Sequence, residues 1–339
     1  MMEKLLNRGV AQVLPSKEGL AALMQKRKIR LYLGIDPTGG KLHLGHSIPL
    51  RKLQQFADLG HEAILVVGTG TVLAGDPSQR ESARSRITER EIAENIKTWK
   101  RQAGKIVDFS KVKIRQNGDW LKKLRLPDIL SIASRVSAVH LLQRDMFQKR
   151  IERGDTVWTH EMLYPLLQGY DSVALDVDLE IGGTDQVFNM LVGRELQKKM
   201  KNKEKYVLCC PMILGLDGRT MSKTSGNTVN IEDEPADMYG KLMSLNDNLI
   251  PQYFELCTDA SPEILAPRDL KAQLAREIVR MYHGEKKAQE AEQEFNQVFR
   301  NKELPSEIRE VRIDESSMQL SDLLVQCQLA SSKGEAKRL

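Results

Sequence analysis

The sequence is poor in cysteine, in aromatic residues and in long apolar runs. Its four cysteines, at positions 209, 210, 257 and 327, form no Cys-x-x-Cys pair, which argues against a zinc site or a disulfide framework and favours a reducing cytoplasm. The longest aliphatic run, residues 63–67, is far shorter than the roughly 20 residues of a membrane-spanning helix. Aromatic residues make up only 5% of the chain, so an aromatic base-stacking surface is not indicated. We therefore expect a cytoplasmic protein with no membrane partner.

Charge of neither sign is in large excess. Lys and Arg total 51 against 46 Asp and Glu, which leaves a net charge of +5 over 339 residues. This mildly basic balance permits a nucleotide or RNA partner without requiring one. The length predicts about two domains. The lysine-rich run at 198–205 is interpreted as a solvated helix end.

Strand-like and helix-like patterns alternate through the first two-thirds of the chain. The apolar patterns predict strands at 31–35, 63–67, 112–115, 177–181 and 206–210, and helices at 44–59, 82–107, 127–143 and 185–200. We expect residues 1–226 to form an α/β domain with a doubly wound, Rossmann-like parallel sheet. Four helical patterns then predict an all-α domain over 227–304, and residues 305–339 are expected to form a linker and the start of another unit.

Two histidines follow the first predicted strand in the run Leu-His-Leu-Gly-His at 42–46. His43 and His46 are three residues apart and share one face at the start of a helix. A helix N-terminus favours anions, and its dipole keeps imidazoles neutral, so that each can donate a hydrogen bond to phosphate. Gly45 leaves room for a flat group to approach the backbone. The alternative is a pair of ordinary capping histidines.

A second feature is the glycine- and hydroxyl-rich loop at 215–226, which contains Met221-Ser222-Lys223 and follows the last predicted strand. Lys223 could hold a triphosphate, although a polar loop between domains is the alternative. The His-x-Gly-His motif alone also occurs in cytidylyl- and adenylyltransferases. The two motifs together, about 175 residues apart and in this order, resemble the paired signature of class I aminoacyl-tRNA synthetases.

Further segments resemble the bacterial tyrosyl-tRNA synthetases. They lie at 31–38 (Leu-Tyr-Leu-Gly-Ile-Asp-Pro-Thr), 75–78 (Gly-Asp-Pro-Ser), 164–171 (Tyr-Pro-Leu-Leu-Gln-Gly-Tyr-Asp) and 182–186 (Gly-Gly-Thr-Asp-Gln). The resemblance covers residues 30–230. The tail from Leu320 resembles the start of the family's C-terminal RNA-binding domain, so we expect that domain to be truncated and tRNA charging to be weak.

The resemblance implies a tyrosine pocket in which Tyr32 and Asp171 face the phenol. Asp76, Tyr164 and Gln168 are then expected to hold the ammonium group, and Gln186 to approach the carboxylate. The spacing of Tyr164, Gln168 and Asp171, at i, i+4 and i+7, independently predicts one face of a helix.

The resemblance also implies ATP and its reacting phosphates on the other side of the site. The residues expected to bind ATP are Gly34, Asp36, Gly45, Gly182, Gly183, Asp185, Met221 and Ser222. Those expected to act on the phosphates are Thr38, His43, His46, Lys223, Thr224, Arg80 and Arg84. Mg²⁺ would arrive with ATP, and no protein metal site is expected.

One position departs from the family pattern, because Thr220 stands where these enzymes usually carry lysine. Loss of that cation should weaken stabilisation of the transition state. Our hypothesis is that Arg219, or the arginines at 80 and 84, compensate.

The implied partners are L-tyrosine, ATP, tRNA(Tyr) and a second copy of the chain, with no DNA. The homodimer interface is expected in the helical region 127–148, whose apolar residues could equally belong to the core of the chain. Two other functions stay open: a tryptophanyl-tRNA synthetase, and a synthetase-like RNA-binding paralogue.

Overall fold

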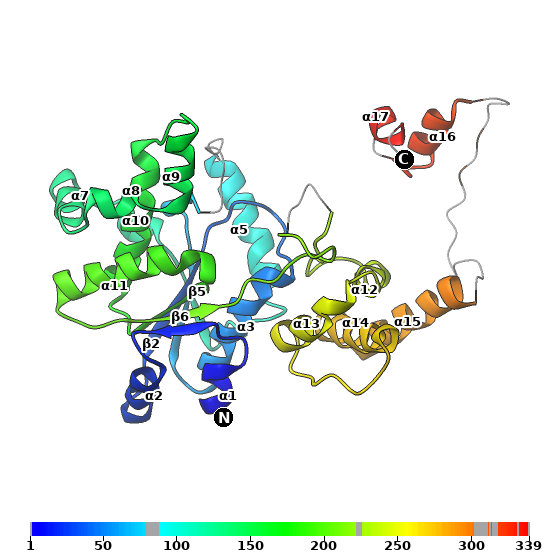
Figure 1. The fold of residues 1–339 in the computed structure, drawn as a ribbon, viewed down its shortest axis with the longest axis horizontal. Coiled ribbons are helices and arrows are strands. Elements are labelled where there is room, and N and C mark those ends of the chain that lie inside the picture. Colours follow the sequence, from blue (N-terminus) through cyan, green and yellow to red (C-terminus); the bar gives the residue numbers. More distant parts are fainter. Residues whose placement is uncertain are drawn as a thin grey trace. The chain divides into compact units, whose positions relative to one another are not determined.

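The computed structural model describes residues 2–78, 88–221, 226–301, 311, 313, 318–330 and 332–337. The chain divides into two compact units, residues 1–292 and 293–339 (Figure 1). The first unit holds the sheet and the helices that surround it. None of the described helices is long and apolar enough to cross a membrane. The domain boundary at residue 226 remains a prediction.

The sheet of the described chain has six strands in the order β1-β6-β5-β2-β3-β4. Their bounds are β1 (Gln12–Leu14), β2 (Arg30–Ile35), β3 (Glu62–Val67), β4 (Val112–Gln116), β5 (Leu179–Gly183) and β6 (Tyr206–Cys210). All neighbours are parallel except β1, which pairs antiparallel with β6. The predicted parallel sheet is confirmed, with β5 two residues later than expected. Strand β1 was not predicted, because three residues with one exposed end carry no clear period.

Helices lie on both sides of this sheet (Figure 1). The long ones are α3 (Leu44–Asp58), α5 (Glu89–Ala103), α10 (Thr159–Leu175) and α11 (Val187–Lys201). Short ones are α1 (Met2–Asn7), α2 (Lys17–Lys26), α4 (Thr71–Ala74), α6 (Gly118–Leu121) and the 3-10 turn η1 (Thr184–Gln186). Strand β3 is buried along nearly its whole length, as expected for a parallel strand covered on both faces. Gly169 and Gly193 let α10 and α11 approach closely, since a Cβ on Gly169 would lie 3.0 Å from the Gly193 nitrogen.

The single helix predicted at 127–143 is wrong. Three short helices occupy the region: α7 (Leu126–Ala133), α8 (Ala138–Leu142) and α9 (Asp145–Glu152). The break carries Ser134 as the C-cap of α7 and Ser137 as the N-cap of α8, and serine favours such ends over helix interiors. The apolar residues divide between the two alternatives that the sequence left open. Ile132, Val136 and Leu141 are core residues that pack with α10 and α11, whereas Leu130 and Val139 are exposed.

All four helices expected after residue 234 are present. They are α12 (Pro235–Met243), α13 (Ile250–Cys257), α14 (Pro267–His283) and α15 (Glu285–Phe295), with a 3-10 turn η2 (Asp247–Leu249) before α13. Tyr239, Phe254 and Ile278 are fully buried among them. In the second unit α15 ends in a π-helical turn (Asn296–Arg300), and the short helices α16 (Leu320–Gln326) and α17 (Lys333–Ala336) are linked by a Lys333–Asp322 ion pair of 2.5 Å.

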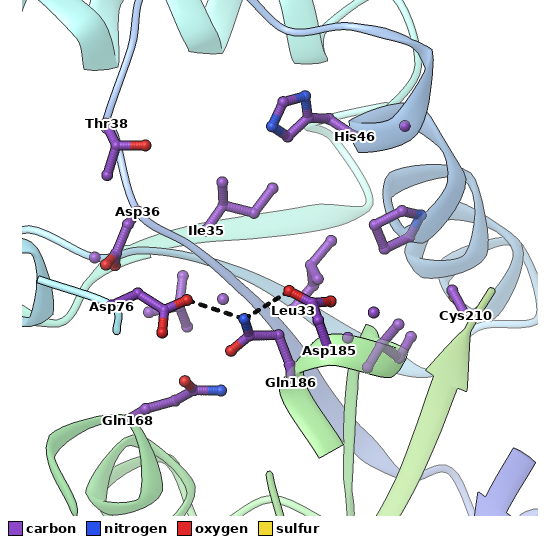
Figure 2. Close-up of a pocket in the computed structure, with 18 of the residues that line it drawn as sticks. Leu33, Ile35, Asp36, Thr38, His46, Asp76, Gln168, Asp185, Gln186 and Cys210 are labelled. Carbon is purple, nitrogen blue, oxygen red and sulfur yellow. Dashed lines mark hydrogen bonds between the residues drawn. The ribbon is translucent and has the colours of Figure 1, made fainter. Parts of the chain in front are cut away.

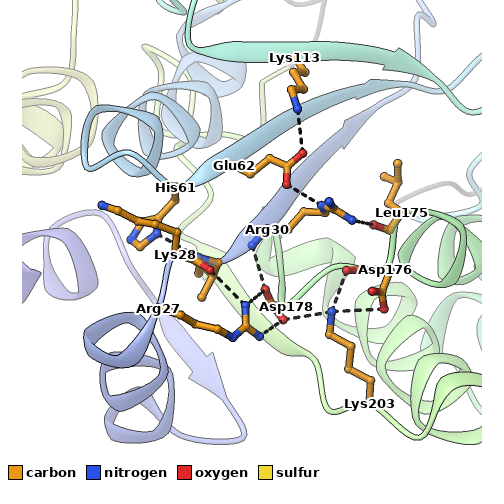
Figure 3. Close-up of polar contacts among 11 residues, drawn as sticks. Arg27, Lys28, Arg30, His61, Glu62, Lys113, Leu175, Asp176, Asp178 and Lys203 are labelled. Carbon is orange, nitrogen blue, oxygen red and sulfur yellow. Dashed lines mark hydrogen bonds and ion pairs between the residues drawn. The ribbon is translucent and has the colours of Figure 1, made fainter.

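An ion-pair network joins the amino ends of three strands (Figure 3). Asp178, just before β5, accepts two hydrogen bonds from the Arg27 guanidinium at 2.7 and 2.9 Å and one from the Arg30 backbone nitrogen at 2.9 Å. Lys203 lies 3.2 Å away. Arg30 in turn pairs with Glu62 of β3 at 2.7 Å. The amino edge of the sheet is therefore held together by ion pairs.

We expect Asp178→Ala to lower the free energy of unfolding by about 2 kcal/mol at neutral pH, because a buried acceptor of charged hydrogen bonds is lost. Burial raises the pKa of Asp178, but Arg27, the Arg30 amide and Lys203 outweigh it, so its pKa lies below the ordinary value. A folded-state pKa below the unfolded one stabilises the protein at higher pH, and that contribution is lost as the pH falls below about 4. Urea unfolding of both proteins between pH 3 and 7 measures this.

Asp58 provides the matched control, since it pairs with Lys111 at 2.7 Å but about half of each side chain is exposed. Asp58→Ala should cost no more than about 0.5 kcal/mol. Equal losses for the two variants would contradict the assignment of Asp178 as the main anchor of this edge.

Candidate active site

A cavity of about 360 Å³ opens at the carboxyl ends of β2 and β5 (Figure 2). Strand β2 pairs in parallel with β3 on one side and with β5 on the other. Successive strands therefore extend the sheet in one direction from β2 to β4 and in the other direction from β2 to β6. Loops from neighbouring strands diverge at such a point and leave a crevice where ligands bind. The position of the cavity thus follows from the strand order.

Most of the predicted site residues meet in this cavity. Those that line it are Gly34, Asp36, Thr38, His43, Gly45, His46, Asp76, Tyr164, Gln168, Asp171, Gly182, Gly183, Asp185, Gln186 and Met221. Tyr32 is fully buried behind the lining residues. Arg80, Arg84, Ser222, Lys223 and Thr224 lie outside the described residues, so their predicted roles remain predictions. Thr220 lines the cavity and Arg219 is exposed.

The two histidines form a cap at the start of α3. His43 is the N-cap, and its Nδ1 accepts a hydrogen bond from the Gly45 nitrogen at 3.2 Å. The Nδ1 of His46 accepts a hydrogen bond from the backbone nitrogen of His43 at 3.2 Å, and the centroids of the two imidazole rings are 3.9 Å apart. A neutral imidazole that accepts at Nδ1 carries its proton on Nε2. Capping, the ordinary role considered for these residues, thus fixes both rings as Nε2 donors beside a helix N-terminus.

The segment that follows the second motif is hydrogen-bonded directly to the first motif. The Leu44 nitrogen donates to the Val229 carbonyl at 3.0 Å, and the Ile231 nitrogen donates to the Leu42 carbonyl at 2.9 Å. Before the undescribed residues 222–225, the chain makes a tight turn in which the Gly215 nitrogen donates to the Arg219 carbonyl at 2.7 Å. Met221 reaches the histidines, since its sulfur would be 3.5 Å from a Cβ placed on Gly45. Segments about 175 residues apart in sequence therefore frame one end of the cavity.

Helix α5 holds the turn between β2 and the histidines. Asn95 Nδ2 donates to the Pro37 carbonyl at 2.8 Å, and Trp99 Nε1 donates to the Gly39 carbonyl. Gln102 donates to the Gly40 carbonyl at 2.7 Å and accepts from the Leu42 nitrogen at 2.6 Å. The sequence analysis missed these residues, because polar side chains on a charged helix give no sign of their partners. They fix the backbone that carries Thr38.

Carboxylates and amides gather at the other end of the cavity. Asp36 accepts hydrogen bonds from Thr71 at 2.6 Å and from the Tyr164 hydroxyl at 3.0 Å. Gln186 Nε2 donates to both Asp76 and Asp185 at 3.0 Å (Figure 2). Burial and the neighbouring carboxylates raise the pKa of Tyr164 well above 10, so this phenol stays protonated and remains a donor. The acceptors at this end suit a cationic group.

Asp171 lines the cavity and is almost fully buried. Its two oxygens accept hydrogen bonds from Asn117 Nδ2 at 3.1 Å and from Trp120 Nε1 at 2.8 Å. Burial raises the pKa of Asp171 well above its usual range, even though these two donors oppose the shift. Asn117 and Trp120 were not predicted, because nothing in the local sequence links the region after β4 to α10. They hold the carboxyl group in one orientation.

The Tyr32 hydroxyl lies 3.0 Å from Ser172 Oγ and 3.5 Å from the backbone carbonyl oxygen of Gln168. The helix face predicted for Tyr164, Gln168 and Asp171 is confirmed on α10. The interpretation of 198–205 as a wholly solvated helix end is wrong for Lys205, which is fully buried and paired with Glu180 of β5. Neither Glu180 nor Lys205 was predicted, although an acidic residue inside a buried strand was a visible signal.

The sequence and the fold are both similar to those of known proteins. A family model for class I tRNA synthetases (W and Y) matches residues 24–300. The tyrosine–tRNA ligase of Thermotoga maritima is 43% identical over an alignment of 349 residues that covers 99% of this chain and 87% of the relative. The chain belongs to the tyrosine–tRNA ligase family. A second such relative, tyrosine–tRNA ligase 2 of Vibrio cholerae, is 40% identical and is covered to 87% of its length.

Solved structures share the fold of this ligase family. Tyrosyl-tRNA synthetase from Archaeoglobus fulgidus, complexed with L-tyrosine, matches with a TM-score of 0.70 at 21% identity, covering 86% of this chain and 98% of that one. A C-terminally truncated mitochondrial tyrosyl-tRNA synthetase from Aspergillus nidulans matches with a TM-score of 0.71 at 20% identity, covering 88% and 94%. The predicted Rossmann-like class I architecture is confirmed.

We expect Gly68→Ala to lower the free energy of unfolding by about 1–3 kcal/mol, because Asp36 packs against the α-carbon of Gly68. A Cβ there would lie 1.8 Å from Asp36 Oδ1 and 2.5 Å from Thr71 Oγ1, so Asp36 would have to leave its two hydrogen-bond donors. Urea unfolding measures the change.

Gly240→Ala, in the interior of α12, is the control. Nothing lies within 4 Å of the position that a Cβ would take there, so alanine should stabilise the helix by about 0.5–1 kcal/mol. The same sign for both substitutions would show that Asp36 does not depend on this close approach.

Proposed function

We propose that the chain activates L-tyrosine with ATP and transfers the tyrosyl group to tRNA(Tyr). The observation that carries this function is the division of one cavity into two chemically different ends. Carboxylates and amides lie at one end, with Asp171 almost fully buried, and two imidazoles at a helix N-terminus lie at the other. The first end suits an amino acid with a polar side chain, and the second suits phosphates.

The first step needs alignment more than acid–base chemistry. The tyrosine carboxylate is ionised at neutral pH, so one of its oxygens attacks the α-phosphorus without a general base. The bond from the α-phosphorus to the bridging oxygen breaks, and pyrophosphate leaves with both electrons of that bond. His43, His46 and Thr38 would donate to the phosphate oxygens, where negative charge develops. We propose that Lys223, Thr224, Arg80 and Arg84 add contacts from segments beyond the described residues.

The nucleotide would occupy the carboxyl ends of β2 and β5. Gly34, Asp36, Gly182, Gly183 and Asp185 line that part of the cavity, and an acidic side chain suits a ribose diol. Mg²⁺ would enter on the phosphates of ATP, where it neutralises charge. The histidine end offers nitrogen donors to phosphate, which suits a metal held by the nucleotide.

Tyrosine would bind with its phenol toward Asp171 and Tyr32 and its ammonium toward Asp76, Tyr164 and Gln168. The carboxylate would then lie by Gln186, between the two ends. Phenylalanine could not make the hydrogen bonds that the phenol hydroxyl would add to those Asp171 and Tyr32 already have, at a cost of about 1–3 kcal/mol for each bond lost in a buried site. Selection against phenylalanine therefore follows from the loss of two hydrogen bonds.

In the second step a ribose hydroxyl of the tRNA 3′ adenosine attacks the tyrosyl carbonyl, and AMP leaves. Contacts between basic side chains and RNA phosphates should make tRNA binding weaken with salt. The four cysteines are free thiols, which suits the reducing cytoplasm that we propose as the location.

We further propose a homodimer formed through α7 and α8. Their outer surface carries exposed apolar side chains, namely Leu126, Ile129, Leu130 and Val139. Large apolar side chains that cluster on a surface mark an interaction site. The buried side of the same helices packs on α10, which carries Tyr164, Gln168 and Asp171, so the interface would lie directly behind the tyrosine pocket.

The activity is tested by ATP–pyrophosphate exchange with the 339-residue chain. We expect exchange that depends on L-tyrosine and exceeds that with L-phenylalanine at least about 100-fold, the effect of two lost hydrogen bonds in a buried site. Exchange with L-tryptophan instead would identify the other branch of the family. Absence of exchange with every amino acid would favour an RNA-binding paralogue.

The dimer is tested by sedimentation equilibrium. The protein should sediment at about twice its chain mass of 38.4 kDa. Leu130→Glu/Val139→Glu should sediment as a monomer, because two charges would be buried in the interface. Ile264→Glu changes a fully exposed apolar residue elsewhere and should leave the dimer intact. A dimeric double variant would exclude this surface as the interface.

A further inference from the structure

A buried ion pair lies at the back of the cavity with no role in the mechanism described above. Lys205 Nζ donates to Glu180 Oε2 and, at 2.8 Å, to Ser172 Oγ. The side chains are 0% and 1% exposed, respectively. Burying two opposite charges rarely stabilises a fold more than apolar packing of the same volume would. The contacts of the pair therefore suggest a functional reason for its presence.

Glu180 determines the orientation of a predicted substrate-binding amide. Gln168 Nε2 donates to Glu180 Oε1 at 3.1 Å. An ionised carboxylate can only accept hydrogen bonds, so it selects the NH₂ side of the amide and turns the carbonyl oxygen away. The bond thus removes the freedom of Gln168 to present either its nitrogen or its oxygen to a ligand.

The oxygen of the same side-chain amide has no hydrogen-bond partner among the described residues. Within the described part of the chain, Gln168 Oε1 is buried and accepts no hydrogen bond. Gln168 lines the cavity, and Figure 2 draws it with Asp76 and Gln186 among the lining residues. A buried polar atom normally has a partner, so a missing one indicates a ligand that supplies it. An oxygen acceptor here calls for an N–H donor.

We propose that Glu180, held by Lys205, is a positioning residue that turns the side-chain oxygen Oε1 of Gln168 toward the ammonium group of the bound amino acid. This inference rests on the proposed function and deepens it, because it explains how an amide comes to favour a cation. With the amide fixed, its oxygen accepts from the ammonium; with the amide reversed, two NH₂ protons would face the ammonium and repel it.

Lys205 makes this arrangement possible. Its ammonium supplies a countercharge and a hydrogen bond to the Glu180 carboxylate, and so holds that carboxylate beside the Gln168 amide. Burial lowers the pKa of Lys205, while Glu180 opposes that shift. Space for the Lys205 ammonium is provided by Gly193, where a Cβ would lie 2.6 Å from Lys205 Nζ.

The test replaces the pair by apolar residues of similar volume, Glu180→Leu/Lys205→Met, which leaves no unpaired charge to unfold the protein. In ATP–pyrophosphate exchange we expect the KM for L-tyrosine to rise about tenfold or more and the KM for ATP to change less than twofold. Competitive inhibition by 3-(4-hydroxyphenyl)propionate, which has the phenol and carboxylate but no ammonium, should change less than threefold. The contrast between the two ligands isolates the ammonium.

Two further variants keep the test decisive. Glu180→Gln/Lys205→Met retains a polar side chain that can accept or donate, so the amide is only partly fixed and the KM for tyrosine should rise about threefold. Lys203→Met/Asp178→Asn removes the neighbouring ion pair, two residues earlier in both segments and away from the cavity. It should lower stability and leave the KM for tyrosine unchanged.

The outcomes separate this inference from the proposed function. Absence of tyrosine-dependent exchange by the unmodified protein would reject the function itself. With exchange present, an unchanged KM for tyrosine in Glu180→Leu/Lys205→Met would overturn the inference. So would an equal loss for tyrosine and for the analogue, since the pair would then support only the general shape of the pocket.

Discussion

The parallel pairing of β2 with β5 is the constraint on which the rest of this structure depends. It brings together two strand ends that are nearly 150 residues apart, Ile35 and Gly183, and the loops beyond them carry Asp36 and Asp185. Because helices connect parallel strands from behind, the carboxyl edge of the sheet stays open at this point. Every predicted binding residue that the structure describes lines the cavity at that opening, except Tyr32, which is buried behind the lining residues.

The two edges of the sheet differ in how their charged side chains are paired. At the amino edge, Asp178 pairs with Arg27 and Lys203, and Glu62 pairs with Arg30 and Lys113 (Figure 3). At the carboxyl edge, carboxylates crowd together, and burial raises the pKa of both Asp171 and Asp185. Such crowding is unfavourable without a ligand. The stable edge supports the site by fixing the strands whose opposite ends carry it.

The pattern of the sequence predicted the elements better than the contacts between them. The short apolar run 63–67, bounded by Gly60 and Gly68, predicted a buried strand, and β3 lies there. The helix expected at 127–143 ends instead at the C-cap Ser134, and a new helix begins after the N-cap Ser137, a break that the apolar periodicity does not register. Strand β1 was missed, since its pairing with β6 comes from a distant segment.

Similar limits apply to the site. Motif spacing was enough to select the histidines, the loop at 215–226 and the polar face of α10, and hence the family. Lys205 illustrates what spacing cannot provide, since its lysine-rich surroundings indicated solvent while Gly193 and Glu180 supply a buried position for it.

The sequence by itself thus determined the alternation of strands and helices, the two signature motifs and the class of reaction, because all three are written in local residue order. Only the tertiary structure decided which atoms meet. It joined 42–44 to 229–231 and aimed both histidine rings through their Nδ1 atoms. It also brought the Gln168 amide into hydrogen-bond contact with the buried carboxylate of Glu180. Hydrogen bonds between distant segments depend on the packing of the whole chain, and no local pattern encodes them.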